Sequence, residues 1–257
     1  MLEIKNQELK TYNINLDIDN NLNVGIFSDD LDIIKSLSLL LAGINKGNIY
    51  EMNENIYDND IYFKSRIFIN NELNYLNTLN ADKISSYYLK SYSKAIDADY
   101  FKALVKATKI RLNAKYKFYY EFDNHKNSLA NNILALSFLS KRIIYKAFNN
   151  IDDKVIKEEY KTKKETIFLD DIKDIKKYLS ILDNIIIFYK ERMHQVSKDD
   201  QILKVLKNED ANNIEIIKNL LFEEENYYYV LATDTVKSIK KLKYDILNIN
   251  NIGEKDE

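Results

Sequence analysis

Two pairs of aspartates are the residues of this chain whose type and placement could support chemistry. Asp29 and Asp30 come shortly after the apolar run VGIF, and Asp170 and Asp171 follow the apolar run TIFL. Carboxylates at the end of a buried strand can hold Mg²⁺ and position a water molecule. They can equally cap the next helix, because they accept hydrogen bonds from its first backbone N–H groups. The surrounding residues must decide between these roles.

The remaining reactive residue types form no recognisable set. His125 and His194 are single and lack metal-ligand spacing, so we expect each to be a surface or core residue. The chain has no cysteine nucleophile and no G-x-S-x-G sequence. The sequence therefore predicts no metal site and no thiol or serine nucleophile of these kinds.

Composition predicts a globular protein without a strong charge preference. The 257 residues are 46% hydrophobic and 30% charged, and the formal net charge is -2 at pH 7. This balance gives no general attraction to nucleic acid, so we expect no nucleic-acid partner. We find neither a signal peptide nor an apolar run of the about 18 residues that a membrane span requires. Together with the lack of cysteine, this predicts a cytoplasmic protein.

The stretch Asn23–Gly43 is the segment that must position the first aspartate pair. Its apolar run leads into the polar turn Ser28-Asp29-Asp30, and an apolar helical pattern follows until Ala42-Gly43. Strand, tight turn, helix and closing glycine is the order in which a phosphate-binding loop is built. The geometry of such a loop is therefore expected here.

Apolar runs predict the other strands, and continuous apolar strands separated by helices imply a buried, largely parallel sheet. The strands expected besides Asn23–Phe27 are Leu2–Lys5, Asn13–Ile18, Asn48–Met52, Ile61–Phe63, Arg66–Ile69, Thr166–Asp171, Asn184–Tyr189, Gln201–Leu206 at a sheet edge, Tyr227–Leu231 and Asp245–Ile249. Leu2–Lys5 and Asn13–Ile18 alternate apolar and polar residues, which predicts a small antiparallel unit.

Helical periodicity covers most of the remaining chain. The helical segments expected are Glu72–Arg111, Ser128–Phe148, Ile172–Leu182, Ile214–Phe222 and Val236–Tyr244. Tyr116–Phe122 is either a strand or an aromatic loop, and the charged segment Asn149–Lys164 is expected to be exposed. Glu223–Glu225 is expected to form a solvated turn.

Several short motifs appear in a recognisable order along these elements. LEIKN is followed by Tyr12, Gly25 by Leu41-Ala42-Gly43, and Gly47-Asn48-Ile49 by FINNE. Further along come Leu136-Ser137 with Lys141-Arg142, and then Phe168-Leu169-Asp170-Asp171. In this order and spacing the motifs resemble the ATP-binding domain of ABC transporters over most of the chain. The tail resembles the small αβ appendix of drug and peptide exporter subunits.

This resemblance implies an α/β fold of the P-loop NTPase type, as in ABC ATPases. The sheet would be mostly parallel with antiparallel strands, a helical insertion and a C-terminal αβ appendix. Residues 1–257 would form one ABC-ATPase-like domain, with a sheet core of 1–71 and 151–209, a helical subdomain of 72–150 and an appendix of 210–257. Tyr12 would be the aromatic residue that stacks on adenine, and Asp170 with Asp171 would be the Walker B carboxylates.

The departures from the family pattern fall on its phosphate-binding residues. In register with GxxGxGK[ST], the glycines are Ser28, Leu31 and Ile33, the lysine is Ile34, and the hydroxyl ligand of Mg²⁺ is Lys35. Bulky and β-branched side chains avoid the backbone conformations with which the glycines wrap a phosphate. The remnant nucleotide site would therefore comprise Tyr12, Ser28, Asp29, Asp30, Ile34, Lys35 and Ser36.

Electrostatics also oppose a phosphate at this loop. Asp29, Asp30 and Asp32 place three carboxylates where a triphosphate would lie. One carboxylate about 4 Å from a phosphate costs about 4 kcal/mol at an effective dielectric constant of about 20. Since micromolar affinity amounts to about 8 kcal/mol, two such contacts would cancel it. We therefore predict a capped helix start here, and we favour the capping role for Asp170 and Asp171 as well.

The other family motifs are altered too. Phe138 and Leu139 follow Leu136-Ser137 where the signature region has glycines, and Lys190 stands in the place of the switch histidine. Asn70 or Asn71 stands in the glutamine loop. The aromatic segment Tyr87–Phe101 is a candidate partner-docking surface. The lysines between Lys154 and Lys164 alternate with acidic residues, so we interpret them as a solvated face.

Three functions remain open from the sequence. The leading hypothesis is a catalytically degenerate ABC-type subunit that contacts a membrane permease or another ATP-binding subunit, or forms a homodimer, with no cofactor. Its location would be cytoplasmic or peripheral on the cytoplasmic face of the cell membrane. The first alternative is a divergent but active exporter ATPase that uses ATP and Mg²⁺, with Lys35 returning a cation to the site. The second is a soluble regulatory protein unrelated to transport.

Overall fold

The central sheet has six strands, and buried apolar residues form most of it. The computed structural model describes residues 1–70, 81–110, 112, 120–146, 153–163, 165–207, 213–239 and 242–249. The strand order is β10-β9-β3-β8-β7-β6. Its strands are β3 (Val24–Ser28), β6 (Arg66–Asn70), β7 (Arg142–Lys146), β8 (Thr166–Asp171), β9 (Asn184–Tyr189) and β10 (Arg192–Ser197).

Five of these strands are parallel, and only β10 runs antiparallel to its neighbour β9. All five residues of β3 are buried, as expected for a strand covered on both faces. Gly25 of β3 lies opposite Phe168 of β8 and Ile185 of β9. A side chain at Gly25 would come within 2.6 Å of Leu182, so close packing requires glycine here.

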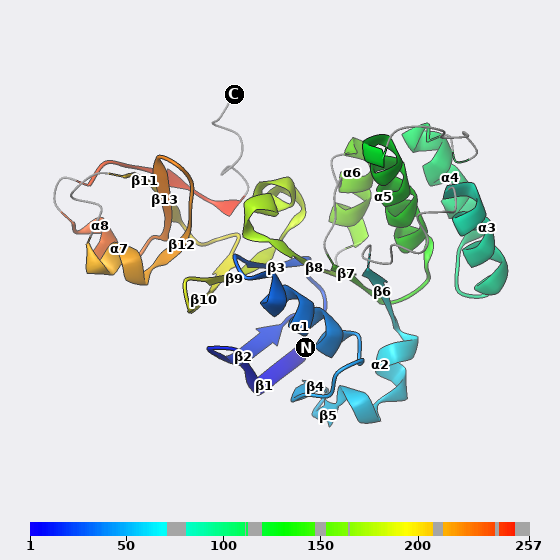
Figure 1. Cartoon of the computed structure of the whole chain (residues 1–257), viewed down its shortest axis with the longest axis horizontal. Coiled ribbons are helices and arrows are strands. Elements are labelled where there is room, and N and C mark those ends of the chain that lie inside the picture. The colour runs from blue at the N-terminus through cyan, green and yellow to red at the C-terminus, as the bar shows by residue number, and fades with distance from the viewer. Residues whose placement is uncertain are drawn as a thin grey trace.

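A layer of antiparallel strands and one helix covers the first face of the central sheet. Strands β1 (Leu2–Leu9), β2 (Tyr12–Ile18), β4 (Ile49–Glu51) and β5 (Glu54–Asn55) form a sheet of order β2-β1-β4-β5. Helix α1 (Leu31–Leu41) lies between this sheet and the central one, as Figure 1 shows. Apolar residues of α1 and of both sheets share one buried cluster.

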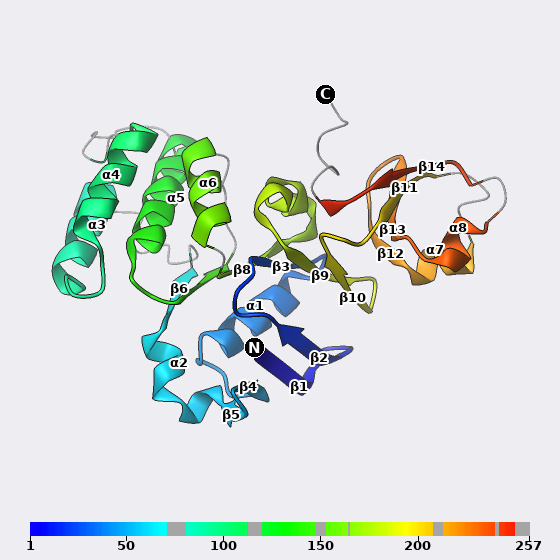
Figure 2. The same ribbon diagram turned by 180° about the vertical axis from the view of Figure 1, so that it is seen from behind.

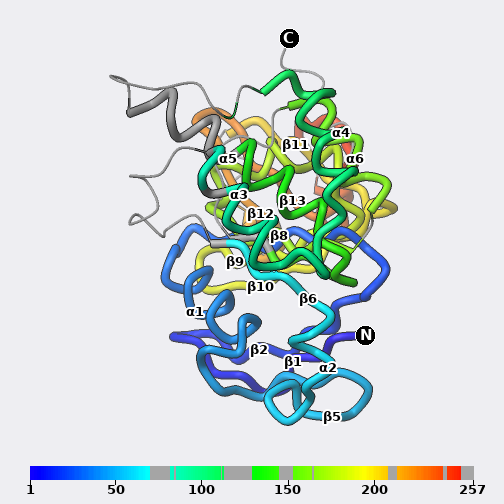
Figure 3. The backbone as a smooth tube through the Cα atoms, turned by 90° about the vertical axis from the view of Figure 1, so that its right-hand side faces the viewer, coloured from blue at the N-terminus to red at the C-terminus, as the bar shows by residue number. Residues whose placement is uncertain are grey.

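Helices gather beyond the other face, near β6 and β7. They are α3 (Ala81–Ser91), α4 (Ala98–Thr108), α5 (Tyr120–Ser137) and α6 (Lys154–Lys163), grouped at one end of the molecule in Figure 2. In Figure 3 they lie above the central sheet, and the β1–β2 hairpin lies below it. In the part of the chain that the structure describes, no helix is long and apolar enough to cross a membrane.

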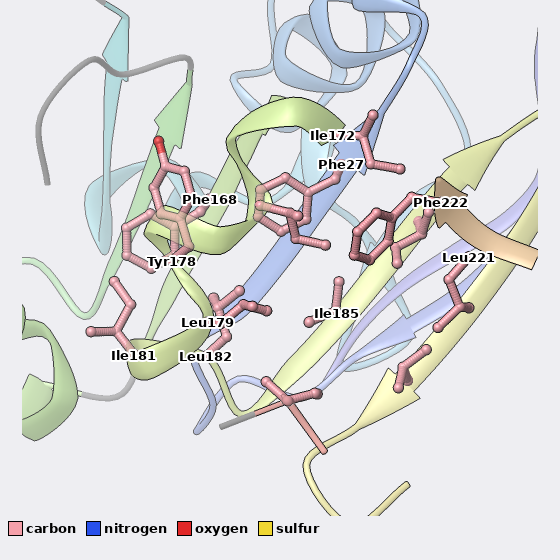
Figure 4. Close-up of a cluster of buried hydrophobic side chains, with 14 of the residues drawn as sticks. Phe27, Phe168, Ile172, Tyr178, Leu179, Ile181, Leu182, Ile185, Leu221 and Phe222 are labelled. Carbon is pink, nitrogen blue, oxygen red and sulfur yellow. The ribbon is translucent and has the colours of Figure 1, made fainter. Parts of the chain in front are cut away.

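A third sheet forms at the opposite end, next to β9 and β10. Its strands β11 (Ile202–Leu206), β12 (Leu220–Glu223), β13 (Tyr227–Leu231) and β14 (Tyr244–Leu247) follow the order β12-β13-β11-β14 and pair antiparallel. Two short helices accompany it, α7 (Ile214–Lys218) and α8 (Asp234–Lys237). Figure 4 shows Phe222 and Leu221 of β12 packing towards Phe27 and Ile185 of the central sheet.

The mixed α/β fold with a mostly parallel sheet is confirmed, and several local predictions are wrong. Ile61–Phe63 is not a strand but part of helix α2 (Asp60–Lys64). The Asn59 side chain accepts hydrogen bonds from the N–H groups of Ile61 and Tyr62, which starts the helix. Three apolar residues were too few to distinguish the two periodicities.

The prediction of one helix over Ser128–Phe148 is also wrong. Helix α5 ends at Ser137, and β7 inserts between β8 and β6 from Arg142 onward. Asn149–Lys164 is not simply an exposed segment either, because α6 buries Ile156 and Tyr160 completely. A short apolar run in a charged context suits a buried strand as well as a helix, and the sequence could not distinguish them.

Smaller corrections concern the second half of the chain. Ile172–Leu182 forms two 3₁₀ segments, η3 (Ile172–Lys177) and η4 (Leu179–Ile181), in place of one helix. Gln201–Leu206 is not an edge strand, since β11 lies inside its sheet, and β10 was not anticipated. Helices predicted over Ile214–Phe222 and Val236–Tyr244 end at Lys218 and Lys237. Tyr120–Phe122 belongs to α5, whereas 113–119 and 71–80 lie outside the described residues.

A buried polar network joins the first antiparallel sheet to the β6–β7 end of the central sheet. Arg66 of β6 pairs with Glu51 of β4, and both side chains are less than a tenth exposed. Asn20 donates a hydrogen bond to the same Glu51 oxygen at 2.5 Å and accepts one from Arg142 at 2.7 Å. Burial and the neighbouring Arg66 lower the pKa of Arg142 to about 10. The buried carboxylate of Glu51 thus pairs with Arg66 directly and is linked to Arg142 through the Asn20 side chain.

We expect Glu51→Gln to destabilise the fold by about 3 kcal/mol, because removing one member of a buried charged network leaves the other charges uncompensated. Urea denaturation would measure the loss. The matched change Asp60→Asn breaks the exposed Lys64–Asp60 pair and should cost less than about 0.5 kcal/mol. Equal unfolding free energies for the two variants would contradict the proposed role of the network.

Candidate functional site

The carboxyl ends of β3, β8 and β9 meet at one edge of the central sheet. Ser28 at the end of β3 lies in register with Asp171 of β8 and Phe188 of β9. In open α/β sheets this edge is where ligands bind. The residues predicted to form the remnant nucleotide site lie here, on β3, the start of α1 and the β1–β2 turn.

The start of α1 is a capped helix end. The Asp30 side chain accepts a hydrogen bond from the backbone N–H of Asp32 at 3.0 Å, and the Asp30 N–H donates to Ser28 Oγ at 3.0 Å. These bonds satisfy donors that a phosphate would otherwise engage. Ile34, which the sequence resemblance aligns with a phosphate-binding lysine, is only 1% exposed and lies in the apolar core.

Lys10 forms ion pairs with the acidic turn at the start of α1. It stands in the β1–β2 turn, and its Nζ lies 2.6 Å from Asp30 Oδ2 and 2.9 Å from Asp32 Oδ2. The hydrogen bonds to Asp30 and Asp32 raise the pKa of Lys10, and the bond from Lys10 lowers the pKa of Asp30. The sequence analysis missed this contact, because no local pattern brings Lys10 next to a turn twenty residues later.

Tyr12 is largely buried and packs against Phe188. It is 9% exposed and its ring packs edge-to-face against Phe188, with centroids 5.2 Å apart. Burial and the nearby Asp29 raise the pKa of its hydroxyl. With 9% of the residue exposed, little of the Tyr12 ring is accessible for stacking on an adenine.

A cavity of about 580 Å³ remains in front of these residues. Four acidic side chains line it, namely Asp29, Asp30, Asp32 and Glu191. The other lining residues are Lys10, Lys190, Thr11, Tyr12 and Leu31. The excess of carboxylates disfavours an anionic ligand. Among the described residues, no group of three or more acidic, histidine or cysteine side chains has the arrangement of a metal site.

The second aspartate pair is already engaged within the chain. Asp170 is 7% exposed, and its carboxylate accepts hydrogen bonds from the Tyr178 hydroxyl at 2.6 Å and from the Asp171 N–H at 2.8 Å. Asp171 caps η3 by accepting a bond from the Lys173 N–H at 3.0 Å. Both carboxylates therefore have structural partners at the positions where Mg²⁺ would require ligands.

The other predicted positions do not converge on this cavity. Lys35 is exposed and Ser36 is half-buried on α1, and neither lines the cavity. Ser137 ends α5 and donates to Ile133 O at 2.7 Å, and Arg142 belongs to the buried network described above. Asn70 ends β6, and Asn71 lies outside the described residues.

The two histidines remain separate. His125 is part of α5, and His194 is on β10. Burial and the neighbouring Arg192 lower the pKa of His194, whose Nε2 has no hydrogen-bond partner among the described residues. His194 does not line the cavity at the strand ends.

Lys190, in the place of the switch histidine, is held by the C-terminal sheet. Its Nζ donates to Glu223 of β12 at 2.6 Å, and the Tyr189 hydroxyl donates to the same oxygen at 2.8 Å. Lys207 pairs with the other oxygen of Glu223 at 3.1 Å. Burial alone would raise the pKa of Glu223, but the bonds from Lys190, Tyr189 and Lys207 outweigh it and lower the pKa to about 2. Glu223 is thus not part of a merely solvated turn.

The fold is that of ABC-type ATP-binding cassettes, and the similarity extends over most of the chain. A solved structure described as a cobalt transport ATP-binding protein matches with a TM-score of 0.59 at 17% identity, covering 91% of this chain and 92% of that one. An ATP-binding subunit of an ABC transporter matches with a TM-score of 0.56 at 12% identity, covering 77% and 90%. A dimeric ATP-binding cassette bound to ADP and Pi matches with a TM-score of 0.52 at 15% identity, and the match covers 76% of this chain and 98% of that one. No protein-family model and no curated protein matches the sequence.

We expect the stability of the protein to fall between about pH 4.5 and pH 2 in a way that depends on Glu223. Its pKa in the folded state is about 2, below the ordinary 4.5, so its stabilising effect is complete above about pH 4.5 and disappears as the pH falls towards 2. Glu223→Gln should remove about 1 to 2 kcal/mol of this pH dependence, measured by urea denaturation at several pH values. Glu215→Gln, which alters an exposed pair with Lys218, serves as the control. An unchanged pH profile in the Glu223 variant would refute the assignment.

Proposed function

We propose that this chain is an ABC transporter ATP-binding-like subunit that has lost nucleotide binding and acts through protein contacts. The observation that carries the proposal is the start of α1, where Asp30 caps the helix, Lys10 pairs with Asp30 and Asp32, and Ile34 is buried. A phosphate loop needs free N–H groups and a lysine at this point. Here the N–H of Asp32 has a partner within the chain, and the position of the lysine faces the core.

The state of the other strand ends supports the same proposal. Tyr178 holds Asp170, Phe188 packs against Tyr12, and Glu223 holds Lys190. A ligand would have to displace these contacts, and the free energy of breaking them would reduce its affinity. We therefore assign no catalytic residue and no cofactor, and treat Asp170 as a structural partner of Tyr178 and Asp171 as the cap of η3.

The partners follow from the class of fold. ABC-type cassettes of known structure include dimeric ones, so we propose another ATP-binding subunit, a second copy of this chain or a membrane permease as the partner. We further propose one functional domain over residues 1–257, with the helices of 72–150 as a helical subdomain. Residues 210–257 would be an appendix like that of drug and peptide exporter subunits. The protein would then work in the cytoplasm or on the cytoplasmic face of the membrane.

A nucleotide titration tests the loss of binding. We expect no heat of binding when ATP with Mg²⁺ is titrated up to about 1 mM. This result would mean that the binding free energy is weaker than about 4 kcal/mol. Asp170→Asn should leave any residual phosphate release unchanged, because Asp170 has only structural partners in this proposal. Saturable ATP binding in the micromolar range, or turnover that disappears in the Asp170 variant, would refute it.

A divergent but active exporter ATPase is the competing function, and Lys35 is the residue that favours it. Lys35 lies one position after Ile34 and is exposed, so a shift of one residue would return a cation to the loop. This function predicts ATP hydrolysis that falls by at least about tenfold in Lys35→Ala. Unchanged hydrolysis in that variant would exclude it.

A regulatory protein without a transporter is the third candidate. Co-purification distinguishes it from the first two: a transport subunit should sediment with membranes only when its permease is present. Recovery in the supernatant whether or not a permease is present would favour regulation instead.

A further inference from the structure

A cavity of about 740 Å³ lies between the edge strand β6 and helices α3 and α5, apart from the site at the strand ends. We propose that it binds a small organic anion, with an apolar body between the strand and the helices and a carboxylate or phosphate group at one end. The volume is within the range of about 300–1,000 Å³ that is typical of small-molecule sites.

Basic side chains are concentrated where three chain segments meet. The Lys141 N–H donates to Ser65 O at 2.7 Å, and the Leu139 N–H donates to Ala95 O at 2.9 Å. These two bonds hold the backbone segments that carry Lys64, Lys94 and Lys141 next to one another at the cavity wall. They also place the basic side chains on a backbone that is fixed by hydrogen bonds, which reduces the entropy cost of binding.

The lining residues carry four cationic side chains and no carboxylate: Lys64, Arg66, Lys94 and Lys141. Lys64 and Arg66 are paired with Asp60 and Glu51. Lys94 and Lys141 form no ion pair with any residue that the structure describes. Glu165 interacts electrostatically with Lys141, but Glu165 does not line the cavity. In a protein of net charge -2, this local excess favours an anionic group.

Ser140 adds a polar group to the wall of this cavity, and it also lines a neighbouring cavity. Its position is between Leu139 and Lys141, and its buried hydroxyl has no hydrogen-bond partner among the described residues. A buried polar group without a partner costs free energy and usually indicates a ligand, ion or water. Because almost none of this oxygen is accessible to solvent, a change of the Ser140 rotamer would be needed for it to donate to an anion in the cavity.

The rest of the wall is apolar and aromatic. Tyr88 of α3 and Tyr92, which follows α3, have near-parallel rings 5.7 Å apart, and the Phe138 ring is 5.9 Å from that of Tyr92. Ile67 and Leu134 line the opposite strand and helix. Because the wall combines cationic side chains with aromatic and aliphatic ones, the cavity matches an amphipathic molecule with a negatively charged group.

Isothermal titration calorimetry with three probes of equal chain length tests the proposal. Dodecanoate and dodecyl phosphate should bind with micromolar affinity, and uncharged dodecanol at least about tenfold more weakly, since it lacks the charge-assisted hydrogen bonds. Lys94→Gln with Lys141→Gln should weaken the two anions about tenfold or more and leave dodecanol unchanged. The relative affinity of dodecanoate and dodecyl phosphate separates a carboxylate site from a phosphate site.

The matched control removes the same charge elsewhere on the helical end of the molecule. Lys106 and Lys109 are exposed at the end of α4 and do not line the cavity, so Lys106→Gln with Lys109→Gln should bind all three probes as the native chain does. Equal affinities for dodecanol and dodecanoate would overturn the proposal, as would equal losses in the two double variants. Binding of an acidic peptide with no binding of either small anion up to about 1 mM would also overturn it.

Discussion

The burial of β3 on both faces is the constraint on which the rest of the structure depends. All five of its residues are buried, and a side chain at Gly25 would collide with Phe27 and Leu182. A strand so enclosed can take only parallel partners that are themselves apolar, which β8 and β9 supply. It also determines where α1 begins, because the chain must leave the sheet directly after Ser28. The position of the candidate site is therefore a consequence of packing, whatever the site binds.

The chemistry at that position is separate from its geometry. Parallel strands that end together bring their terminal polar groups close, and an isolated charge there needs a partner. In ligand-binding members of such folds the ligand supplies it. In this chain Lys10 supplies it to Asp30, Tyr178 to Asp170, and Glu223 to Lys190. Internal partners of this kind stabilise the protein without a ligand and raise the cost of binding one, which is why topology alone does not establish function here.

Features encoded in local sequence could be predicted, and features made by distant segments could not. The continuous apolar runs of β3, β8 and β9 and the acidic start of α1 were sufficient for the core of the sheet. By contrast, β7 is a short apolar run that periodicity assigned to a helix. Arg142 resembled part of a signature region, yet it bonds to Asn20, 122 residues earlier in the chain. Lys10 contacts the acidic turn only because β1 and β2 are folded over α1. Such contacts depend on tertiary structure, and no local pattern along the sequence indicates them.

The distribution of partnered and unpartnered charge decides where this fold retains the capacity to bind. A group already paired within the chain must give up that pair to bind a ligand, whereas an exposed group without an ion pair only exchanges water for the ligand. At the carboxyl ends of the strands, Asp30, Asp170 and Lys190 all have internal partners. Beside β6, Lys94 and Lys141 have no ion pair among the described residues, and Ser140 has no hydrogen bond there. The same physical reasoning that argues against a nucleotide at the first location therefore favours an anion at the second.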